Sequence, residues 1–290
     1  MKPMKELLNF SIINIDKPSG PTSFTVSEYV KKQLGLSKTS HFGTLDPKVT
    51  GVLPVALGRA CKLTGFFLGH DKEYVGILHT HEDVEMKKLQ KLIDKNFVGK
   101  ITQMPPVKSA VKRAERVREV KRWELLEKDG KDFLFIAEVE GGTYIRKLCS
   151  DLGEMINGAH MAELRRVRAG IFSEDDKMVK LDEFSRAVEE YKKGNENKLR
   201  EMLTPGEEAI KKIFPVVSVK KNAVKALLTG KPLFKRDIVG RVPGEGVFAV
   251  FSGDKFVEMA EKTDKKGKEV SSKLEQSSSN IVAKALFVYN

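Results

Sequence analysis

The chain has 290 residues, of which 40% are hydrophobic and 32% are charged, and its formal net charge is +12. The apolar fraction is large enough for a packed core, so the composition excludes an intrinsically disordered chain, and the length predicts about two domains. The isoelectric point near 9.4 indicates a polyanionic partner such as nucleic acid.

Cysteine content and hydropathy bear on the cellular compartment. The two cysteines, Cys61 and Cys149, are too few for a disulfide framework or a four-thiolate zinc site. The sequence has no apolar run of the ~18 residues that a membrane span needs, and its N-terminus lacks a signal-peptide pattern. We therefore expect a cytoplasmic protein that does not bind membranes.

The first two thirds of the chain mix predicted strands and helices. An apolar run predicts a strand over residues 11–15, after which Thr22 or Ser23 caps a helix that runs to residue 34. The later expected elements are a helix from 58, a strand over 74–79, a helix over 84–97 capped by Asp83, a hairpin of 123–126 with 133–139, a helix over 144–156 and a strand over 164–171. Because strict strand–helix alternation is missing, we expect an α+β fold with a mixed sheet.

The composition changes after residue 172. Residues 175–203 are highly charged and predict a surface helix, and a breaker cluster at 203–206 marks a boundary. Beyond it, short apolar runs predict strands over 214–219, 246–251, 255–260 and 281–289, which favours a small β-barrel, and 263–280 reads as a mobile loop. We expect one domain over residues 1–205 and a second over 206–290, with residues 1–10 able to associate with the second.

The segment around Asp46 is the best candidate for chemistry. Pro47 biases Asp46 toward an extended or turn backbone, and Gly43 and Gly51 permit turns on both sides. A carboxylate fixed on such a loop, in a basic chain, is a candidate nucleophile or base. The alternative is an ordinary Asp-Pro turn in which the carboxylate binds nearby backbone amides.

Four motifs in order along the chain carry a resemblance to one family. They are IDKPSGPTS at 15–23, GTLDP at 43–47, GTYIRKL at 142–148 and GAHMAELRR at 158–166. Together they resemble the ordered motifs of the TruB-type pseudouridine synthases, and several motifs in register are far more specific than one. The resemblance implies a mixed-sheet pseudouridine synthase catalytic domain over residues 1–205, a C-terminal RNA-binding PUA domain over 206–290, and no cofactor.

Within that family the chain resembles the archaeal, dyskerin-like branch. The supporting segments are KVTGVLPVALG at 48–58 and QMPPVKSAVKR at 103–113. This resemblance implies action on rRNA uridines chosen by an H/ACA guide RNA. The implied protein partners are a small Nop-type protein, a Gly/Arg-family barrel protein and a ribosomal-protein-like kink-turn binder.

The resemblance also implies roles for individual side chains. Asp46 acts near the anomeric carbon, either as a nucleophile or as a base in a glycal route, and Arg146 pairs with it to favour its ionised form. Tyr74 stacks against the target base. Without the resemblance, Arg146 would be read as an ordinary surface arginine on a helix, and Tyr74 as an ordinary half-buried tyrosine of a strand. The implied substrate-binding residues are His41, which holds the target nucleotide out of its stack, Leu164, which packs beside the base or is a plain core leucine, Lys17, which shapes a loop at the site, and Tyr144.

Two further patterns concern ligands. Residues 108–122 hold seven basic side chains and two acidic ones, which favours phosphate contacts over a merely solvated face; the RNA-binding candidates are Lys108, Lys112, Arg113 and Arg116. His79 and His81 share one strand face as metal ligands can, but the segment fits a strand-to-helix turn and the reaction requires no metal, so we expect none.

Other functions remain open at this level. Guide-independent modification of the tRNA T-loop is the alternative within the same enzyme class. A non-catalytic RNA-binding scaffold would use the positive charge equally well, although Asp46, Tyr74 and Arg146 at family positions argue against it. A glycosidase or a nuclease is disfavoured, because neither a second catalytic carboxylate nor a metal-binding carboxylate cluster is evident.

Overall fold

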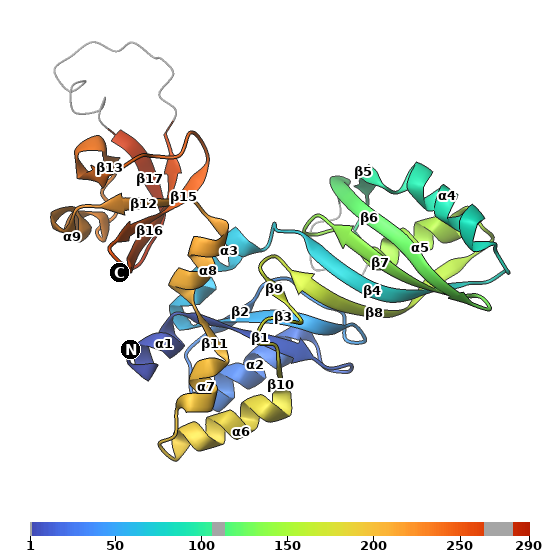
Figure 1. Ribbon diagram of the computed structural model, residues 1–290, viewed down its shortest axis with the longest axis horizontal. Helices are drawn as coiled ribbons and strands as arrows, with labels where there is room; N and C mark the ends of the chain where they lie inside the picture. The colour runs from blue at the N-terminus through green and yellow to red at the C-terminus, as the bar shows by residue number, and fades with distance from the viewer. Residues whose placement is uncertain (1, 106–113, 264–280) are drawn as a thin grey trace, which may run out of the picture. The chain divides into compact units, whose positions relative to one another are not determined.

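The computed structural model describes residues 2–105, 114–263 and 281–290. The chain divides into two compact units, Met1–Thr204 and Pro205–Asn290, which are treated separately below (Figure 1).

The first unit contains a large sheet and helices packed against it. Its strands are β1 (Ser11–Lys17), β2 (Thr39–His41), β3 (Thr50–Leu57), β4 (Lys72–Thr80), β5 (Gly99–Gln103), β6 (Arg116–Asp129), β7 (Asp132–Val139), β8 (Ala159–Ala169), β9 (Phe172–Ser173), β10 (Val179–Lys180) and β11 (Leu203–Pro205). Its helices are α1 (Met4–Asn9), α2 (Ser23–Leu34), the 3₁₀ segment η1 (Gly58–Leu63), α3 (Thr64–Phe67), α4 (Met86–Asn96), α5 (Ile145–Glu154), α6 (Leu181–Lys192) and α7 (Asn197–Glu201).

The sheet is mixed. Its strand order over the described residues is β10-β1-β3-β8-β4-β7-β6-β5. Outside this order, β11 pairs with β1, β2 with β3, and β9 with β8. The β1–β10 and β3–β8 pairs are parallel, whereas β1–β3, β4–β8, β4–β7 and β6–β7 are antiparallel. The prediction of an α+β fold with a mixed sheet is confirmed.

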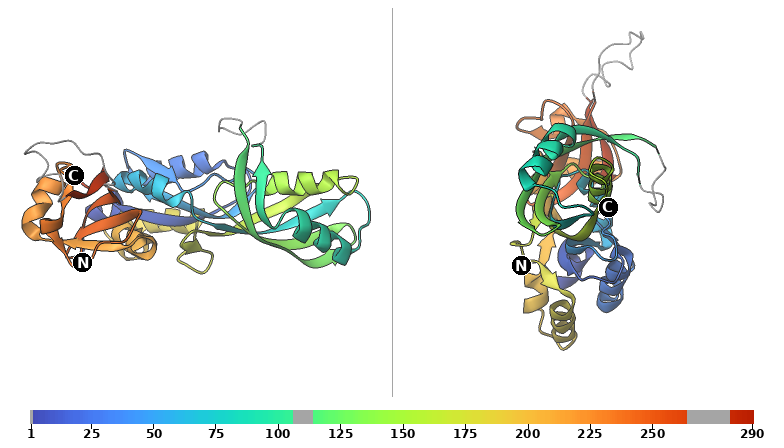
Figure 2. Two further views of the ribbon diagram at one scale, coloured as in Figure 1. Left: turned by 90° about the horizontal axis from the view of Figure 1, so that it is seen from above. Right: turned by 90° about the vertical axis from the view of Figure 1, so that its right-hand side faces the viewer.

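Local sequence explains why the central elements form. Thr22 caps α2 by accepting a hydrogen bond from the Thr25 amide at 3.0 Å, and Gly35 ends the helix in a left-handed conformation. Along β4, buried residues alternate with partly exposed ones, the two-residue period of a strand with one core face. Figure 2 shows α4 and α5 beside the β6–β7 part of the sheet, where their apolar faces join the core around Trp123.

Three expectations about individual helices and strands were wrong. The helix α4 begins at Met86 with Glu85 before it, and Asp83 instead pairs with Lys128 at 2.5 Å. Strand β8 begins at Ala159, five residues before the predicted start, because backbone pairing with β4 extends beyond the apolar part of the sequence. The charged stretch over 175–203 forms two helices, α6 and α7, with the short strand β10 before them, where the sequence had predicted one helix.

The second unit is a small sheet with short helices. Its elements are α8 (Gly206–Ile213), β12 (Val216–Val219), η2 (Lys221–Ala223), α9 (Val224–Leu227), β13 (Leu233–Phe234), η3 (Lys235–Asp237), β14 (Ile238–Val239), β15 (Val247–Ser252), β16 (Lys255–Lys262) and β17 (Ile281–Val288). The described strands form a sheet in the order β13-β17-β16-β15-β12-β14. The loop expected over 263–280 lies, apart from Thr263, outside the described residues.

One buried carboxylate stands out in this unit. Glu258 lies in β16 with 0% of its surface exposed, and neither carboxylate oxygen has a hydrogen-bond partner among the described residues. Burial raises the pKa of Glu258 from 4.5 to about 7. The folded protein therefore holds this proton at pH values where the unfolded chain has released it.

This shift predicts a pH-dependent stability. Because the folded state binds more protons, stability falls as the pH rises from about 4.5 to 7. We expect Glu258→Gln to match the wild type near pH 4.5 and to exceed it by about 2–3 kcal/mol at pH 8. Urea unfolding at both pH values measures this, with the exposed Glu261→Gln on the same strand as the control. An equal effect of the two substitutions at pH 8 would disprove the assignment.

Candidate active site

The loop between β2 and β3 carries Asp46 and is held by a buried lysine. Lys17, at the end of β1, is 0% exposed, and its Nζ donates hydrogen bonds to the carbonyls of Pro18 and Pro47 at 2.9 Å and of Val49 at 2.8 Å. Burial lowers the pKa of Lys17, and the nearby charge of Asp46 opposes that change. Lys17 therefore shapes the loop, and its ammonium group is fully engaged in doing so.

A serine from α2 fixes the loop next to the carboxylate. Ser23 Oγ accepts a hydrogen bond from the Leu45 amide at 2.7 Å and donates one to the Leu45 carbonyl at 3.0 Å. Both partners belong to one residue, so the hydroxyl satisfies a donor and an acceptor that would otherwise be buried without partners. Leu45 precedes Asp46 directly, and its backbone is thereby tied to the first turn of α2.

A buried arginine braces the loop from the other side. Arg166 of β8 is 1% exposed; its Nε donates to the Val52 carbonyl at 2.8 Å, and its Nη2 donates to the Gly43 carbonyl at 3.0 Å. Burial lowers the pKa of Arg166, and the neighbouring Tyr74 opposes that change. One guanidinium therefore joins the start of the Asp46 loop, at Gly43, to strand β3, at Val52.

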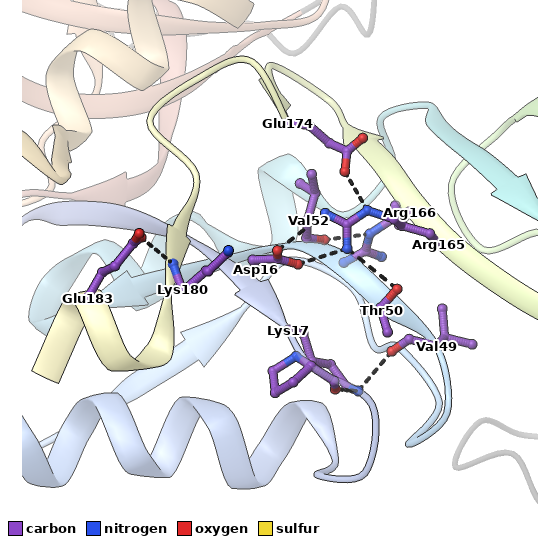
Figure 3. A network of polar contacts seen from close by, with 11 residues as sticks. Asp16, Lys17, Val49, Thr50, Val52, Arg165, Arg166, Glu174, Lys180 and Glu183 are labelled. Atoms are coloured by element: carbon purple, nitrogen blue, oxygen red, sulfur yellow. Dashed lines mark hydrogen bonds and ion pairs between the residues drawn. The ribbon is translucent and has the colours of Figure 1, made fainter.

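Figure 3 shows the neighbouring Arg165, whose guanidinium pairs with two carboxylates. Arg165 Nη1 and Nη2 donate to the two carboxylate oxygens of Asp16 at 3.0 and 3.3 Å, and its Nε donates to Glu174 at 2.5 Å. In the sheet register Arg165 faces Thr50 and Arg166 faces Gly51, so both side chains meet the first residues of β3. A Cβ at Gly51 would lie 2.2 Å from the Arg166 carbonyl oxygen, and only glycine fits there.

The carboxylate of Asp46 itself reaches solvent. It pairs with Arg146 in the first turn of α5, and the two side chains are 45% and 48% exposed. The two residues lie 100 positions apart in the sequence, and the tertiary structure brings them into contact as their assigned roles require. A solvent-accessible carboxylate held beside a guanidinium can act on a bound substrate without first being freed from a buried pair.

Two predicted base-binding side chains lie on adjacent strands. Tyr74 of β4 is 7% exposed and stands opposite Arg166 of β8. Leu164, two positions before Arg166, stands opposite Gly76, two positions after Tyr74. A Cβ at Gly76 would lie 2.8 Å from Leu164 Cδ1, so glycine here lets the leucine side chain cross β4. Tyr74 and Leu164 therefore form one apolar surface on the core face of the sheet.

The other two predicted substrate residues, His41 and Tyr144, lie at the ends of secondary-structure elements. His41 ends β2; burial and then the charge of Arg166 lower its pKa, so the imidazole is neutral at pH 7. Tyr144 precedes α5, and Gln103 both accepts from its amide at 3.1 Å and donates to its carbonyl at 3.3 Å. This amide pair fixes the start of the helix that carries Arg146.

Three residues at the site were not predicted from the sequence. Ser23 hydrogen-bonds the backbone of Leu45, Arg166 hydrogen-bonds the carbonyl of Gly43, and Lys72 is buried beside them on β4. Lys72 precedes Tyr74 by two positions on the same buried face, and its Nζ donates to the Leu68 and His70 carbonyls, both at 2.5 Å. Burial, then the charge of Arg166, lowers the pKa of Lys72 to about 8. The two-residue period of β4 was the available signal for Lys72. Arg166 ends the motif at 158–166, but nothing in the sequence indicated that its side chain reaches the Asp46 loop.

The predicted RNA-binding stretch is only partly described. Lys108, Lys112 and Arg113 lie outside the described residues, and Arg116 is the first residue of β6. Three further basic side chains of this stretch meet carboxylates: Arg118 with Glu140, Lys121 with Asp71, and Arg122 with Glu73. These ion pairs reduce the free positive charge along β6, which the sequence had suggested was available for phosphates.

Known families match most of the first unit. Residues 31–145 match the TruB family pseudouridylate synthase (N terminal domain), and residues 146–211 match the tRNA pseudouridylate synthase B C-terminal domain. A "Probable tRNA pseudouridine synthase B" of Methanocaldococcus jannaschii is 44% identical over 244 residues, which are 84% of this chain and 72% of that protein. The chain belongs to the TruB family of pseudouridylate synthases. This TruB-family chain is also 45% identical to the protein of the same description from Methanopyrus kandleri, over 87% of this chain and 75% of that one.

Solved structures agree with this membership. A chain in the "Crystal Structure of a Cbf5-Nop10-Gar1 Complex" matches 99% of this TruB-family chain and 87% of its own length, with a TM-score of 0.86 and 37% identity. A chain in the "Structure of H/ACA RNP bound to a substrate RNA containing 2'-deoxyuridine" matches 100% of this chain and 88% of its own, with a TM-score of 0.84 and 34% identity. Within the described residues, no helix is long and apolar enough to cross a membrane.

The clamp on Leu45 predicts a separable effect on turnover of this TruB-family enzyme. Ser23→Ala removes both hydrogen bonds to Leu45, and Ser27→Ala, one turn along α2, removes only the 3.0 Å bond from Ser27 Oγ to Thr39 Oγ1. We expect each to cost about 1–3 kcal/mol of stability. Only Ser23→Ala should also lower kcat, by about tenfold, because it frees the carboxylate from its position.

Denaturant unfolding and a tritium-release assay of uridine isomerisation measure the two effects. Equal kcat values for the two serine variants would show that the clamp on Leu45 does not position Asp46.

Proposed function

We propose that this enzyme converts uridine to pseudouridine in RNA with Asp46 as the group that acts at the sugar. The observation that carries the assignment is the ion pair of Asp46 with Arg146 on a loop braced by Lys17, Ser23 and Arg166. The reaction breaks the bond between C1′ and N1 of uridine, turns the uracil and joins C1′ to C5. A carboxylate near the anomeric carbon supports such bond breakage, as in retaining glycosidases.

The guanidinium of Arg146 supports the charge of Asp46. It favours the carboxylate form on which either route depends, namely attack at C1′ or removal of a ribose proton to give a glycal. Because both side chains are about half exposed, the site can receive a nucleotide that has left its stack. Lys17 and Arg166 satisfy the loop carbonyls of Pro47, Val49 and Gly43, so the loop can keep this conformation when RNA binds.

The uracil ring is assigned to the surface formed by Tyr74 and Leu164. Tyr74 can stack on the base, and its hydroxyl can take part in removing the proton from C5 after the new bond forms. Arg166 stands opposite Tyr74 on the neighbouring strand. His41 is assigned to hold the target nucleotide outside its stack. Tyr144 contributes through the start of α5, which places Arg146.

We further propose that RNA is chosen by an H/ACA guide and that the usual substrate is rRNA. The support is the similarity, at TM-scores of 0.83–0.86, to chains solved with Nop10, with Gar1 and in an H/ACA ribonucleoprotein with substrate RNA. The corresponding partners are a small Nop-type protein, a Gly/Arg-family barrel protein and a ribosomal-protein-like kink-turn binder. The second unit is assigned as a PUA-like RNA-binding domain on the strength of its small six-stranded sheet and its place in the chain.

Direct action on tRNA is the second candidate. The similar proteins from several archaea carry the description "Probable tRNA pseudouridine synthase B". The same Asp46 centre would serve both substrates, because the chemistry at the target uridine is the same.

Replacing the carboxylate tests the chemical role. We expect Asp46→Asn to lower tritium release from RNA labelled at uridine C5 by at least about 10⁴-fold, with RNA affinity changed less than about threefold, since the amide keeps the shape and loses the charge. The exposed Asp94→Asn on α4 is the control and should retain full activity. A fully active Asp46→Asn enzyme would rule out the mechanism.

Substrate choice is tested with the same label. The pure protein should release little tritium from a tRNA transcript, and addition of a guide–target duplex with the three partner proteins should raise release by at least about 100-fold. Release from tRNA by the protein alone would instead establish the stand-alone tRNA enzyme. RNA binding without any release would favour a scaffold.

A further inference from the structure

Three histidines gather on the face of the sheet opposite to Tyr74. In the sheet register His79 of β4 stands directly between Asp132 of β7 and His160 of β8, and His81 follows the end of β4 on the same side. Positions 79 and 74 differ by an odd number, so the two side chains leave opposite faces of the strand. His81 and His160 are exposed to solvent, and none of the three histidines belongs to the proposed reaction site.

The rings lie close to one another. Their centroids are 5.1 Å apart for His79 and His160, 5.5 Å for His81 and His160, and 6.4 Å for His79 and His81. His81 Nε2 is 3.3 Å from His160 Nδ1. Two imidazole nitrogens on one tetrahedral zinc ion, each about 2.0–2.1 Å from the metal, are separated by about 3.3 Å.

A carboxylate orients the third ring. His79 Nδ1 lies 2.7 Å from Asp132 Oδ1, which leaves its Nε2 as the nitrogen available to a ligand. Metal-binding histidines commonly donate their second ring nitrogen to a carboxylate in this way, which fixes the tautomer. The cross-strand pairing of His79 with Asp132 makes this contact a consequence of the sheet register.

The backbone at Gly158 makes room for His81. A Cβ at this position would lie 2.2 Å from His81 Nδ1, and the His81 amide donates to the Gly158 carbonyl at 2.9 Å. The ring is thereby held against the turn that leads into β8, with Nε2 directed toward His160. Lys131 donates to the His81 carbonyl at 2.6 Å, so its charge is engaged with the backbone behind the ring.

We propose that His79, His81 and His160 bind one divalent transition-metal ion of the zinc class, with Asp132 orienting His79. Two of the three nitrogens already stand at the spacing of ligands on one ion. No group of three ligating side chains in the described parts of the chain is yet arranged around a metal position, so His79 turns toward the other two rings on binding. From the sequence no metal was expected, because the His79–His81 segment fits a strand-to-helix turn and the isomerisation requires no metal. The third histidine comes from β8, 79 residues after His81.

The test is a calorimetric titration of the EDTA-treated full-length protein with Zn²⁺, repeated with Co²⁺ for its visible absorption. We expect one ion per chain and a Co²⁺ spectrum of nitrogen coordination. His81→Asn and His160→Asn should each lower the affinity at least about tenfold, and Asp132→Asn by about tenfold. His70→Asn, which changes a half-buried histidine outside the cluster, should leave affinity unchanged.

A second readout separates ligation from folding. At one fixed Zn²⁺ concentration, the Tm of the wild type and of His70→Asn should rise equally, and the rise should be clearly smaller in His81→Asn and His160→Asn. Circular dichroism checks that each variant is folded, and the two ligand variants provide independent tests. Weak binding of several ions, equal in the wild type and all variants, would mean an adventitious ion only and would overturn the proposal, whatever the result for uridine isomerisation.

Discussion

The structure depends on supplying hydrogen-bond donors to the backbone of the Asp46 loop. This segment leaves the sheet between β2 and β3, so its buried carbonyls lack strand partners and would be costly to leave unmet. Lys17 donates to the loop carbonyls of Pro47 and Val49, and Arg166 donates to the loop carbonyl of Gly43. Each cation also binds one main-chain oxygen outside the loop, that of Pro18 for Lys17 and that of Val52 for Arg166. Since these buried cations bind backbone dipoles and no carboxylate, Asp46 is left to pair with Arg146 at the solvent edge.

Arg166 lies between the Asp46 loop, which is assigned to the sugar, and Tyr74, which is assigned to the base. Arg166 binds the carbonyls of Gly43 and Val52, and it stands opposite Tyr74 in the register of β4 and β8. The opposite face of these two strands carries His79 and His160, so one pair of strands supports two sets of chemical groups.

Choice of RNA is a separate matter from the chemistry at uridine. The Asp46 loop, Arg146 and Tyr74 act on one nucleotide and are compatible with a guided or an unguided substrate. Many basic side chains of β6 meet carboxylates, which directs attention to other parts of the chain, including the second unit, for the binding of long RNA. The split of the chain at Thr204 allows these two tasks to be carried by different units.

Sequence alone determined the features that depend on nearby residues. The sequence predicted the mixture of strands and helices, the cap at Thr22, the turn-forming glycines at 43 and 51, and the ordered family motifs. Each of these rests on a local backbone preference or on a short pattern. Tertiary structure decided which distant groups meet. Arg166 reaches Gly43 across 123 positions, and His160 reaches His81 across 79, because strand register places them together, and register is set by packing of the whole sheet.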